Sequence, residues 1–236
     1  MRDIQADLRQ SYNLVAEDYA AHFRDEMEKK PFDRRMLDWL IDKVGGLGLI
    51  CDMGCGPGQV ASYIHDRGVQ ACGVDLSTAM IVQARRLHPA AIEFSEGNML
   101  ALNSVADGAY GGIAAFYSIV NIPPSSLAQA LGELYRVLRN GGTLLLSHHI
   151  GDEVKHLDEW WGKKVSLDFY FYRTAEVKSR LLDAGFEIEE VIERESHIRR
   201  LNTKAAARIC LRESSEKDGA NIVYGRRPLM TIYFDL

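Results

Sequence analysis

The stretch Asp52-Met53-Gly54-Cys55-Gly56-Pro57-Gly58-Gln59 places three glycines at every second position. It ends a short apolar run that begins at Leu47, and it precedes a run of helical periodicity from Gln59 to Arg67. Glycine permits positive φ and lets a ligand approach the backbone without a Cβ in the way. The stretch therefore predicts a strand-to-helix turn that closes around a ligand, although a tight turn without a ligand remains an alternative.

Length and composition limit the class of protein. The 236 residues suffice for a full hydrophobic core, and we expect a single domain over residues 1–236. A net charge of -5, with Lys and Arg spread along the chain, gives no basic surface for a nucleic acid. We find neither the apolar core of a signal peptide nor a run long enough to cross a bilayer, so we expect a cytoplasmic protein without a membrane partner. The cysteines form no CxxC pair and fit packing roles in a reduced compartment: Cys51, Cys55, Cys72 and Cys210.

Short apolar runs alternate with helical patterns over much of the chain. Helices over residues 4–22 and 32–44 are expected to form an N-terminal cap (residues 1–44). The core that follows (residues 45–150) predicts an α/β fold, with a mostly parallel sheet covered by helices on both faces. The expected strands are 47–54, 69–75, 91–97, 109–120, 142–150 and 186–196, and the expected helices are 59–67, 77–87, 125–138 and 174–184.

Two later segments depart from this alternation. Residues 151–173 are polar and aromatic and form a candidate lid or substrate wall, and residues 174–212 resume with a helix and strands. Residues 213–236 contain a charged link and a final apolar run, MTIYFDL, to which the sequence assigns no role.

The ends of the second and third strands suit a nucleoside. Asp75 can accept hydrogen bonds from both hydroxyls of a ribose, although it also fits an acid near a helix N-terminus. Asn98 can reach the exocyclic amine of an adenine with Met99 along its face, and it equally fits an ordinary turn. The third glycine of the turn comes one residue too early for the GxGxxG pattern, which disfavours a nicotinamide dinucleotide.

In chain order, the segments LICDMGCGPG, GVDLS, EGNM, AFYSIV and RVLRNGGTLLL resemble the class I S-adenosylmethionine-dependent methyltransferases, especially the small-molecule branch. The resemblance covers roughly residues 10–212 and implies a Rossmann-like, seven-stranded, mostly parallel sheet with a reversed last strand. It implies S-adenosyl-L-methionine as the cofactor, with the methionine end at Asp52, Gly54, Gly56 and Gly58, the ribose at Asp75 and the adenine at Asn98 and Met99. Further cofactor contacts are expected from Cys55, Leu76, Ser77 and Phe116.

The N-terminal segment SYNLVAEDYAAHF also resembles a segment of this family in which a helix folds over the cofactor. Tyr12 and Tyr19 are seven residues apart and share one face of the expected helix. Their hydroxyls are therefore expected at the cofactor or the substrate, and two core aromatics of an amphipathic helix are the alternative.

Candidate bases lie at the end of the fifth strand. His148 and His149 point to opposite faces of a strand, so at most one is expected to enter the site directly, and a structural role remains open for both. No standard spacing of metal ligands is present, and we expect no metal. The acceptor is expected to meet residues of the fourth and fifth strands and of the aromatic insertion: Tyr117, Asn121, His148, Trp160 and Phe171.

These features predict methyl transfer from S-adenosyl-L-methionine to an O, N or C nucleophile of a small metabolite, by in-line displacement. The expected partner is thus a small-molecule methyl acceptor, and the protein is expected to be a monomer or homodimer. A methyltransferase of macromolecules and a noncatalytic cofactor-binding protein are the alternatives.

Overall fold

The structure is a computed structural model that describes residues 3–194 and 229–235. Within these ranges the main sheet has seven strands in the order β3-β2-β1-β4-β5-β9-β8, and every neighbouring pair is parallel. The strand order reverses between β1 and β4. In an open parallel sheet the carboxyl ends of the strands at this reversal leave a crevice for a ligand.

The elements follow the predicted alternation. The strands of the main sheet are β1 (Ile50–Met53), β2 (Ala71–Asp75), β3 (Glu93–Glu96), β4 (Tyr110–Phe116), β5 (Leu138–His149), β8 (Glu187–Arg194) and β9 (Leu229–Asp235). The helices are α1 (Ile4–His22), α2 (Glu26–Lys29), α3 (Pro31–Val44), α4 (Gln59–His65), α5 (Thr78–Leu87), α6 (Pro124–Val137) and α7 (Thr174–Asp183), with 3-10 turns η1 (Gly45–Leu47) and η2 (Ile119–Asn121). A separate hairpin consists of β6 (Val154–Trp160) and β7 (Lys163–Tyr170).

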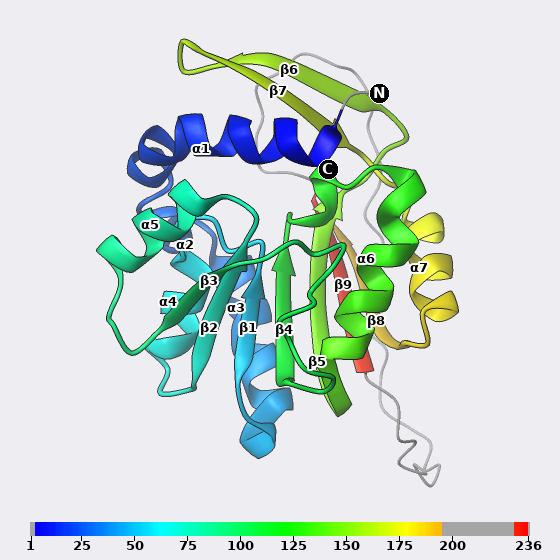
Figure 1. Ribbon diagram of the computed structural model, residues 1–236. Coiled ribbons are helices and arrows are strands. Elements are labelled where there is room, and N and C mark those ends of the chain that lie inside the picture. Colours follow the sequence, from blue (N-terminus) through cyan, green and yellow to red (C-terminus); the bar gives the residue numbers. More distant parts are fainter. Residues whose placement is uncertain (1–2, 195–228, 236) are drawn as a thin grey trace, which may run out of the picture.

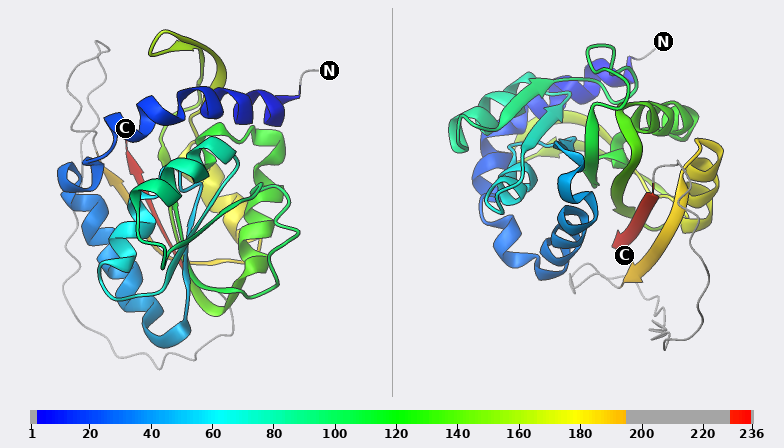
Figure 2. Two further views of the ribbon diagram at one scale, coloured as in Figure 1. Left: turned by 60° about the vertical axis from the view of Figure 1, so that its left-hand side comes forward. Right: turned by 90° about the horizontal axis from the view of Figure 1, so that it is seen from below.

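Helices cover both faces of the main sheet because its central strands are apolar on both sides. In β5, Leu144 and Leu146 pack with α6 and α7, whereas Leu145 packs with α3, α4 and α5. Figure 2 shows these two groups of helices on opposite sides of the strands. All three leucines are fully buried, and this two-sided burial explains the continuous apolar runs in the sequence. The predicted α/β fold is therefore confirmed.

The predicted reversal of the last strand is wrong. The sheet contains β9 between β5 and β8, and β9 runs parallel to both. An antiparallel neighbour can be reached through a tight turn, but a parallel neighbour needs a crossover of about a dozen residues or more. Residues 195–228 separate β8 from β9 and exceed that length. The apolar run near the end of the chain, which had no predicted role, is this strand, while Cys210 lies outside the described residues.

Helix α1 and the hairpin cover the carboxyl ends of the central strands (Figure 1). Val15 of α1 packs against Val165 and Leu167 of β7 in a small apolar cluster. The Ser11 hydroxyl accepts a hydrogen bond from the Ser166 backbone N at 2.9 Å. The N-terminal helix and the residues of the insertion thus form one layer over the sheet. No helix among the described residues has the length and apolar character needed to cross a membrane.

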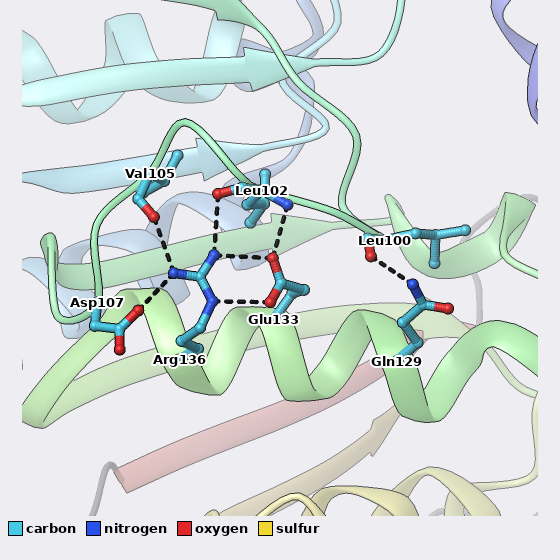
Figure 3. A network of polar contacts seen from close by, with 7 residues as sticks. All are labelled: Leu100, Leu102, Val105, Asp107, Gln129, Glu133 and Arg136. Atoms are coloured by element: carbon cyan, nitrogen blue, oxygen red, sulfur yellow. Dashed lines mark hydrogen bonds and ion pairs between the residues drawn. The ribbon is translucent and has the colours of Figure 1, made fainter.

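The loop between β3 and β4, residues 97–109, is held on α6 by Arg136 (Figure 3). Its guanidinium donates to the backbone oxygens of Leu102 and Val105, at 3.0 and 2.9 Å, and pairs with Asp107 at 2.6 Å. Glu133 pairs with the same guanidinium at 2.8 Å and accepts from the Leu102 backbone N at 2.7 Å. Because this loop begins with Asn98 and Met99, α6 fixes where these two residues lie.

Replacing Arg136 with Met should loosen this loop, since two backbone oxygens and two carboxylates lose their shared donor. We expect a lower thermal midpoint and at least about tenfold faster hydrogen exchange at the Leu102 amide. The matched control is Arg180→Met on the exposed surface of α7, where the ion pair with Glu176 spans 3.9 Å and contributes little. Equal effects of the two substitutions would contradict the assigned role of Arg136.

Candidate active site

A cavity lies at the carboxyl ends of β1, β2 and β4, beneath α1. Most of the predicted site residues line it: Tyr12, Tyr19, Asp52, Gly54, Cys55, Gly56, Asp75, Leu76, Asn98, Met99, Phe116, Tyr117 and Asn121. The structure does not bring the remaining ones to its wall: Gly58, Ser77, His148, His149, Trp160 and Phe171. The cavity thus forms where the glycine turn, the ends of the strands and the N-terminal helix meet.

The glycine turn needs its glycines for two separate reasons. Gly54 has φ of 78°, and a Cβ there would lie 2.4 Å from the Cβ of Ser118, just beyond β4. Gly58 has φ of 90° and precedes α4, where a Cβ would meet the ring of Phe94 at 2.8 Å. Gly58 therefore holds the turn in shape without facing the cavity, whereas Gly54 lines the cavity and lets the backbone pass close to β4.

Asp52 is a buried carboxyl at the end of β1. It accepts a hydrogen bond from the Ala61 backbone N at 3.1 Å, in the first turn of α4. Burial raises the pKa of Asp52 to about 8; the bond from Ala61 opposes this rise, and the nearby carboxylates of Asp75 and Glu26 add to it. Asp52 is therefore poised to ionise when a cation enters the cavity.

Asp75 connects the glycine turn with the loop that follows β2. One carboxylate oxygen accepts from the Gly56 backbone N at 2.8 Å, and the other accepts from the Ser77 backbone N at 2.8 Å. Burial raises the pKa of Asp75, and these bonds oppose the rise. Each oxygen retains a lone pair for a further donor. Asp75 thus orders the glycine turn and still faces the cavity.

Ser77 has a structural position. Its hydroxyl caps α5 by accepting from the Met80 backbone N at 3.1 Å, and it donates to Asn13 Oδ1 at 2.7 Å. The cap of this helix is therefore Ser77 and not Asp75, which leaves Asp75 available to a ligand.

Asn98 serves both of the roles considered for it. Its Oδ1 accepts from the Leu100 backbone N at 2.9 Å, as in an ordinary Asx turn, and the residue also lines the cavity. Met99 lies beside it on the same wall, and Leu76 and Phe116 line the cavity from the ends of β2 and β4.

The two tyrosines of α1 face the cavity together. Their rings meet edge to face with centroids 6.3 Å apart. Tyr12 Oη donates to Asn121 Oδ1 at 2.8 Å. Burial raises the pKa of both phenols well above the usual value, so both stay protonated.

The two histidines at the end of β5 have different surroundings. His148 is fully buried, its Nδ1 lies 2.9 Å from the His149 backbone O, and its ring meets that of Tyr172 at 6.0 Å. Burial lowers the pKa of His148 to about 4. His149 lies between the rings of Tyr117 and Phe171, with centroid distances of 5.0 and 5.3 Å. His149 therefore contacts a residue that lines the cavity, Tyr117.

Sequence reasoning missed a charged group at the N-terminus of α3. Lys30 Nζ lies 2.8 Å from a carboxylate oxygen of Glu26, 3.7 Å from one of Asp33 and 4.8 Å from the ring centre of Tyr117. All three charged residues line the cavity, and Asp33 is fully buried. An aspartate directly after Lys-Pro-Phe, where an amphipathic helix begins, was the available signal. Among the described residues, the acidic and basic side chains of Asp, Glu and Lys on the cavity wall are therefore four carboxyls (Glu26, Asp33, Asp52, Asp75) and one amine (Lys30).

Metal ligation has no support in the described part of the chain. There, no three side chains of His, Cys, Asp or Glu are grouped as a metal ion would require.

The tight contact at Gly54 predicts a difference between two glycines of the turn. Gly54→Ala adds a clash with Ser118 to the strain of positive φ, so we expect a loss of about 3 kcal/mol or more in unfolding free energy. Gly56→Ala, at φ of 51°, has Tyr19 at 3.9 Å as its nearest neighbour and should lose only about 1 kcal/mol. Urea denaturation measures both, and equal losses would contradict the close approach of the turn to β4.

Comparison with known proteins agrees with this geometry. A family model for a methyltransferase domain matches residues 50–142. A malonyl-[acyl-carrier protein] O-methyltransferase of Enterobacter lignolyticus is 29% identical over 147 residues, which are 60% of this chain and 55% of that protein. A demethylmenaquinone methyltransferase of Thermus thermophilus is 33% identical over 118 residues, which are 48% of this chain and 51% of that protein. The chain spans about half the length of these curated relatives.

Solved structures share the fold. The DhpI–SAH complex superposes with a TM-score of 0.61 at 18% identity, over 77% of this chain and 87% of that one. An S-adenosylmethionine-dependent methyltransferase from Mesorhizobium loti gives a TM-score of 0.53 at 18% identity, over 66% of this chain and 81% of that one. Residues 50–142 thus match a methyltransferase domain, and the strand order, the glycine turn after β1 and the acid at the end of β2 are similar to those of the class I S-adenosylmethionine-dependent methyltransferases.

Proposed function

We propose that the protein binds S-adenosyl-L-methionine in this cavity and transfers its methyl group to a nucleophile of a small molecule. The charge of the cavity wall is the observation that carries the proposal. Four carboxyls and one ammonium surround the cavity in the described residues, and this pattern complements a ligand with a sulfonium, an ammonium and one carboxylate. A dinucleotide would bring two phosphate charges into the same carboxyl-rich space, which electrostatics disfavours.

The wall offers a partner for each part of this cofactor. In the proposed arrangement, Asp75 accepts from the ribose hydroxyls and Met99 lies along the adenine beside Asn98. Asp52 and the backbone of Gly54 and Gly56 meet the methionine end. Lys30 pairs with the methionine carboxylate in exchange for part of its contact with Glu26.

A buried polar atom on the wall supports this placement. Ser118 lines the cavity, and its buried Oγ has no hydrogen-bond partner among the described residues. Buried hydroxyls are normally satisfied, so an unsatisfied one on a residue of the cavity wall suits a site that a polar ligand fills.

The bound cofactor would supply a methyl group on a good leaving sulfur, so the protein's own contribution is alignment and exclusion of water. Helix α1 and the hairpin cover the cavity and restrict water. Tyr12, Tyr19 and Tyr117 line its upper wall and orient the acceptor. His149 is the proposed base where the acceptor must lose a proton, because it contacts Tyr117 at the edge of the cavity. The two curated relatives are named for malonyl-[acyl-carrier protein] and for demethylmenaquinone.

Calorimetry with S-adenosylmethionine, S-adenosylhomocysteine and NAD tests the proposal. We expect binding of both sulfur nucleosides and not of NAD. Asp75→Ala should weaken S-adenosylmethionine binding by roughly 1 to 3 kcal/mol, because the ribose loses its acceptor. Glu93→Ala, an exposed acid on the neighbouring β3, is the matched control and should bind normally. If a folded wild-type protein binds neither sulfur nucleoside, the proposal fails.

The proposal also predicts a pH dependence of cofactor affinity. In the empty cavity the pKa of Asp52 is about 8, so its carboxyl is mostly protonated at neutral pH. A bound cation favours the ionised form, and binding below pH 8 must then release a proton. Affinity should therefore rise between about pH 6 and 8, by up to about tenfold per pH unit, and level off above pH 8.

Asp52→Asn should bind more weakly and lose this dependence, because its amide does not titrate. Calorimetry in buffers of different ionisation enthalpy measures the released proton directly. A wild-type affinity that stays constant from pH 6 to 8 would remove Asp52 from the cation site.

A further inference from the structure

A chain of hydrogen bonds leads from the hairpin into the cavity. The Asp168 backbone O in β7 accepts from Asn121 Nδ2 at 2.9 Å, and Asn121 Oδ1 accepts from Tyr12 Oη at 2.8 Å. A carbonyl oxygen can only accept, so the nitrogen of the Asn121 amide must face Asp168 and its oxygen must face Tyr12. The direction of both hydrogen bonds is therefore fixed by chemistry.

The single hydroxyl proton of Tyr12 is therefore held by Asn121. The hydroxyl has one proton, which Asn121 receives, and it can offer the cavity only the lone pairs of its oxygen. Nothing in the described part of the chain donates to that oxygen, and both Tyr12 and Asn121 line the cavity. Because burial raises the pKa of Tyr12 well above the usual value, the group remains a neutral phenol.

The charges around Tyr12 also favour a ligand group that donates a hydrogen bond. The single ammonium in the described wall, that of Lys30, is engaged by Glu26 and Asp33. An acceptor that carries a carboxylate at the reacting end would meet the lone pairs of Tyr12 and the field of four carboxyls. A hydroxyl or an amine can instead donate a hydrogen bond to Tyr12.

We propose that Asn121 is a positioning residue that locks Tyr12 as a hydrogen-bond acceptor, and that the site thereby takes hydroxyl or amine acceptors and rejects carboxylates. This inference rests on the proposed function of the same cavity. The acceptor's oxygen or nitrogen donates its hydrogen to Tyr12 Oη, which aims a lone pair at the methyl carbon. The new C–O or C–N bond forms as the methyl–sulfur bond breaks, the bonding electrons leave on sulfur, and the acceptor's proton passes to the proposed base, His149.

The chemical class of the product tests this inference. The full-length protein is incubated with methyl-labelled S-adenosylmethionine and the low-molecular-mass fraction of a cell extract, and the labelled products are then treated with alkali. Methyl esters of carboxylates release volatile labelled methanol, whereas ethers and methylamines keep the label. We expect base-stable label, and a predominance of base-labile label would overturn the inference.

Two variants test the roles of Tyr12 and Asn121 separately. Tyr12→Phe removes the accepting oxygen and should raise the KM of the purified acceptor about tenfold, with a smaller change in kcat. Asn121→Leu frees the Tyr12 hydroxyl to donate into the cavity, so the base-labile fraction should rise at least about tenfold. Asn121→Ala also removes the acceptor of the Tyr12 proton and makes the same test should the Leu variant fail to fold.

The matched control is Ser11→Ala. Ser11 also joins α1 to the hairpin, through Ser166, but it does not line the cavity. It should loosen the cover without changing the product class. If Asn121→Leu and Ser11→Ala give the same product profile, Asn121 has only a structural role and the inference is overturned.

Calorimetry of S-adenosylmethionine binding on every variant distinguishes a failure of the proposed function from a failure of the role assigned to Tyr12. A wild-type protein that does not bind it contradicts the proposed function. A protein that binds it and yields esters contradicts only the polarity assigned to Tyr12.

Discussion

The close approach of Gly54 to Ser118 is the constraint on which the site depends. The strand order reverses between β1 and β4, so the chain leaving β1 must pass against the end of β4. A Cβ on Gly54 would lie 2.4 Å from that of Ser118, and any larger residue would push the two strand ends apart. The turn then places Gly56 where its N–H reaches the Asp75 carboxylate. One backbone contact thus positions the first two loops, and through them the floor of the cavity.

The carboxyls of the cavity are costly to bury without a ligand. Burying Asp33 and Asp52, and partly burying Asp75, is unfavourable, and backbone N–H groups or Lys30 offset only part of this cost. The fold tolerates the excess of negative groups because a cationic ligand would complete their environment. Tyr117 is a second unfavourable feature: it has φ of 50°, and its N–H is held by the oxygens of Ser147 at 3.1 Å. Such strain persists where surrounding structure fixes it, and it clusters at functional sites.

The sequence was sufficient for features set by local pattern. The core strands and the helices between them follow from apolar runs and helical spacing, and the glycines and Asp75 followed from their places at strand ends. Features set by distant partners were not predictable. Strand β9 pairs with strands far away in the sequence, so its place and direction depend on a crossover that no local pattern encodes. The hairpin was not predicted because its turn is Trp161-Gly162, both at positive φ, and lacks the common Asn-Gly signal.

The same distinction applies to the acceptor side of the site. Tyr12 was predicted to face the ligand from the family resemblance and from helical spacing, but the direction of its hydrogen bond depends on Asn121 and on a backbone oxygen of β7. These three residues are brought together only by the folding of α1 and the hairpin over the sheet. The direction of these hydrogen bonds depends on α1, η2 and β7 together and cannot be predicted from any one of them. It decides whether Tyr12 offers the cavity a donor or an acceptor. Under the proposed function, specificity for the acceptor therefore follows from how the covering layer closes on the sheet, while the glycine turn and the strand ends fix the cofactor side.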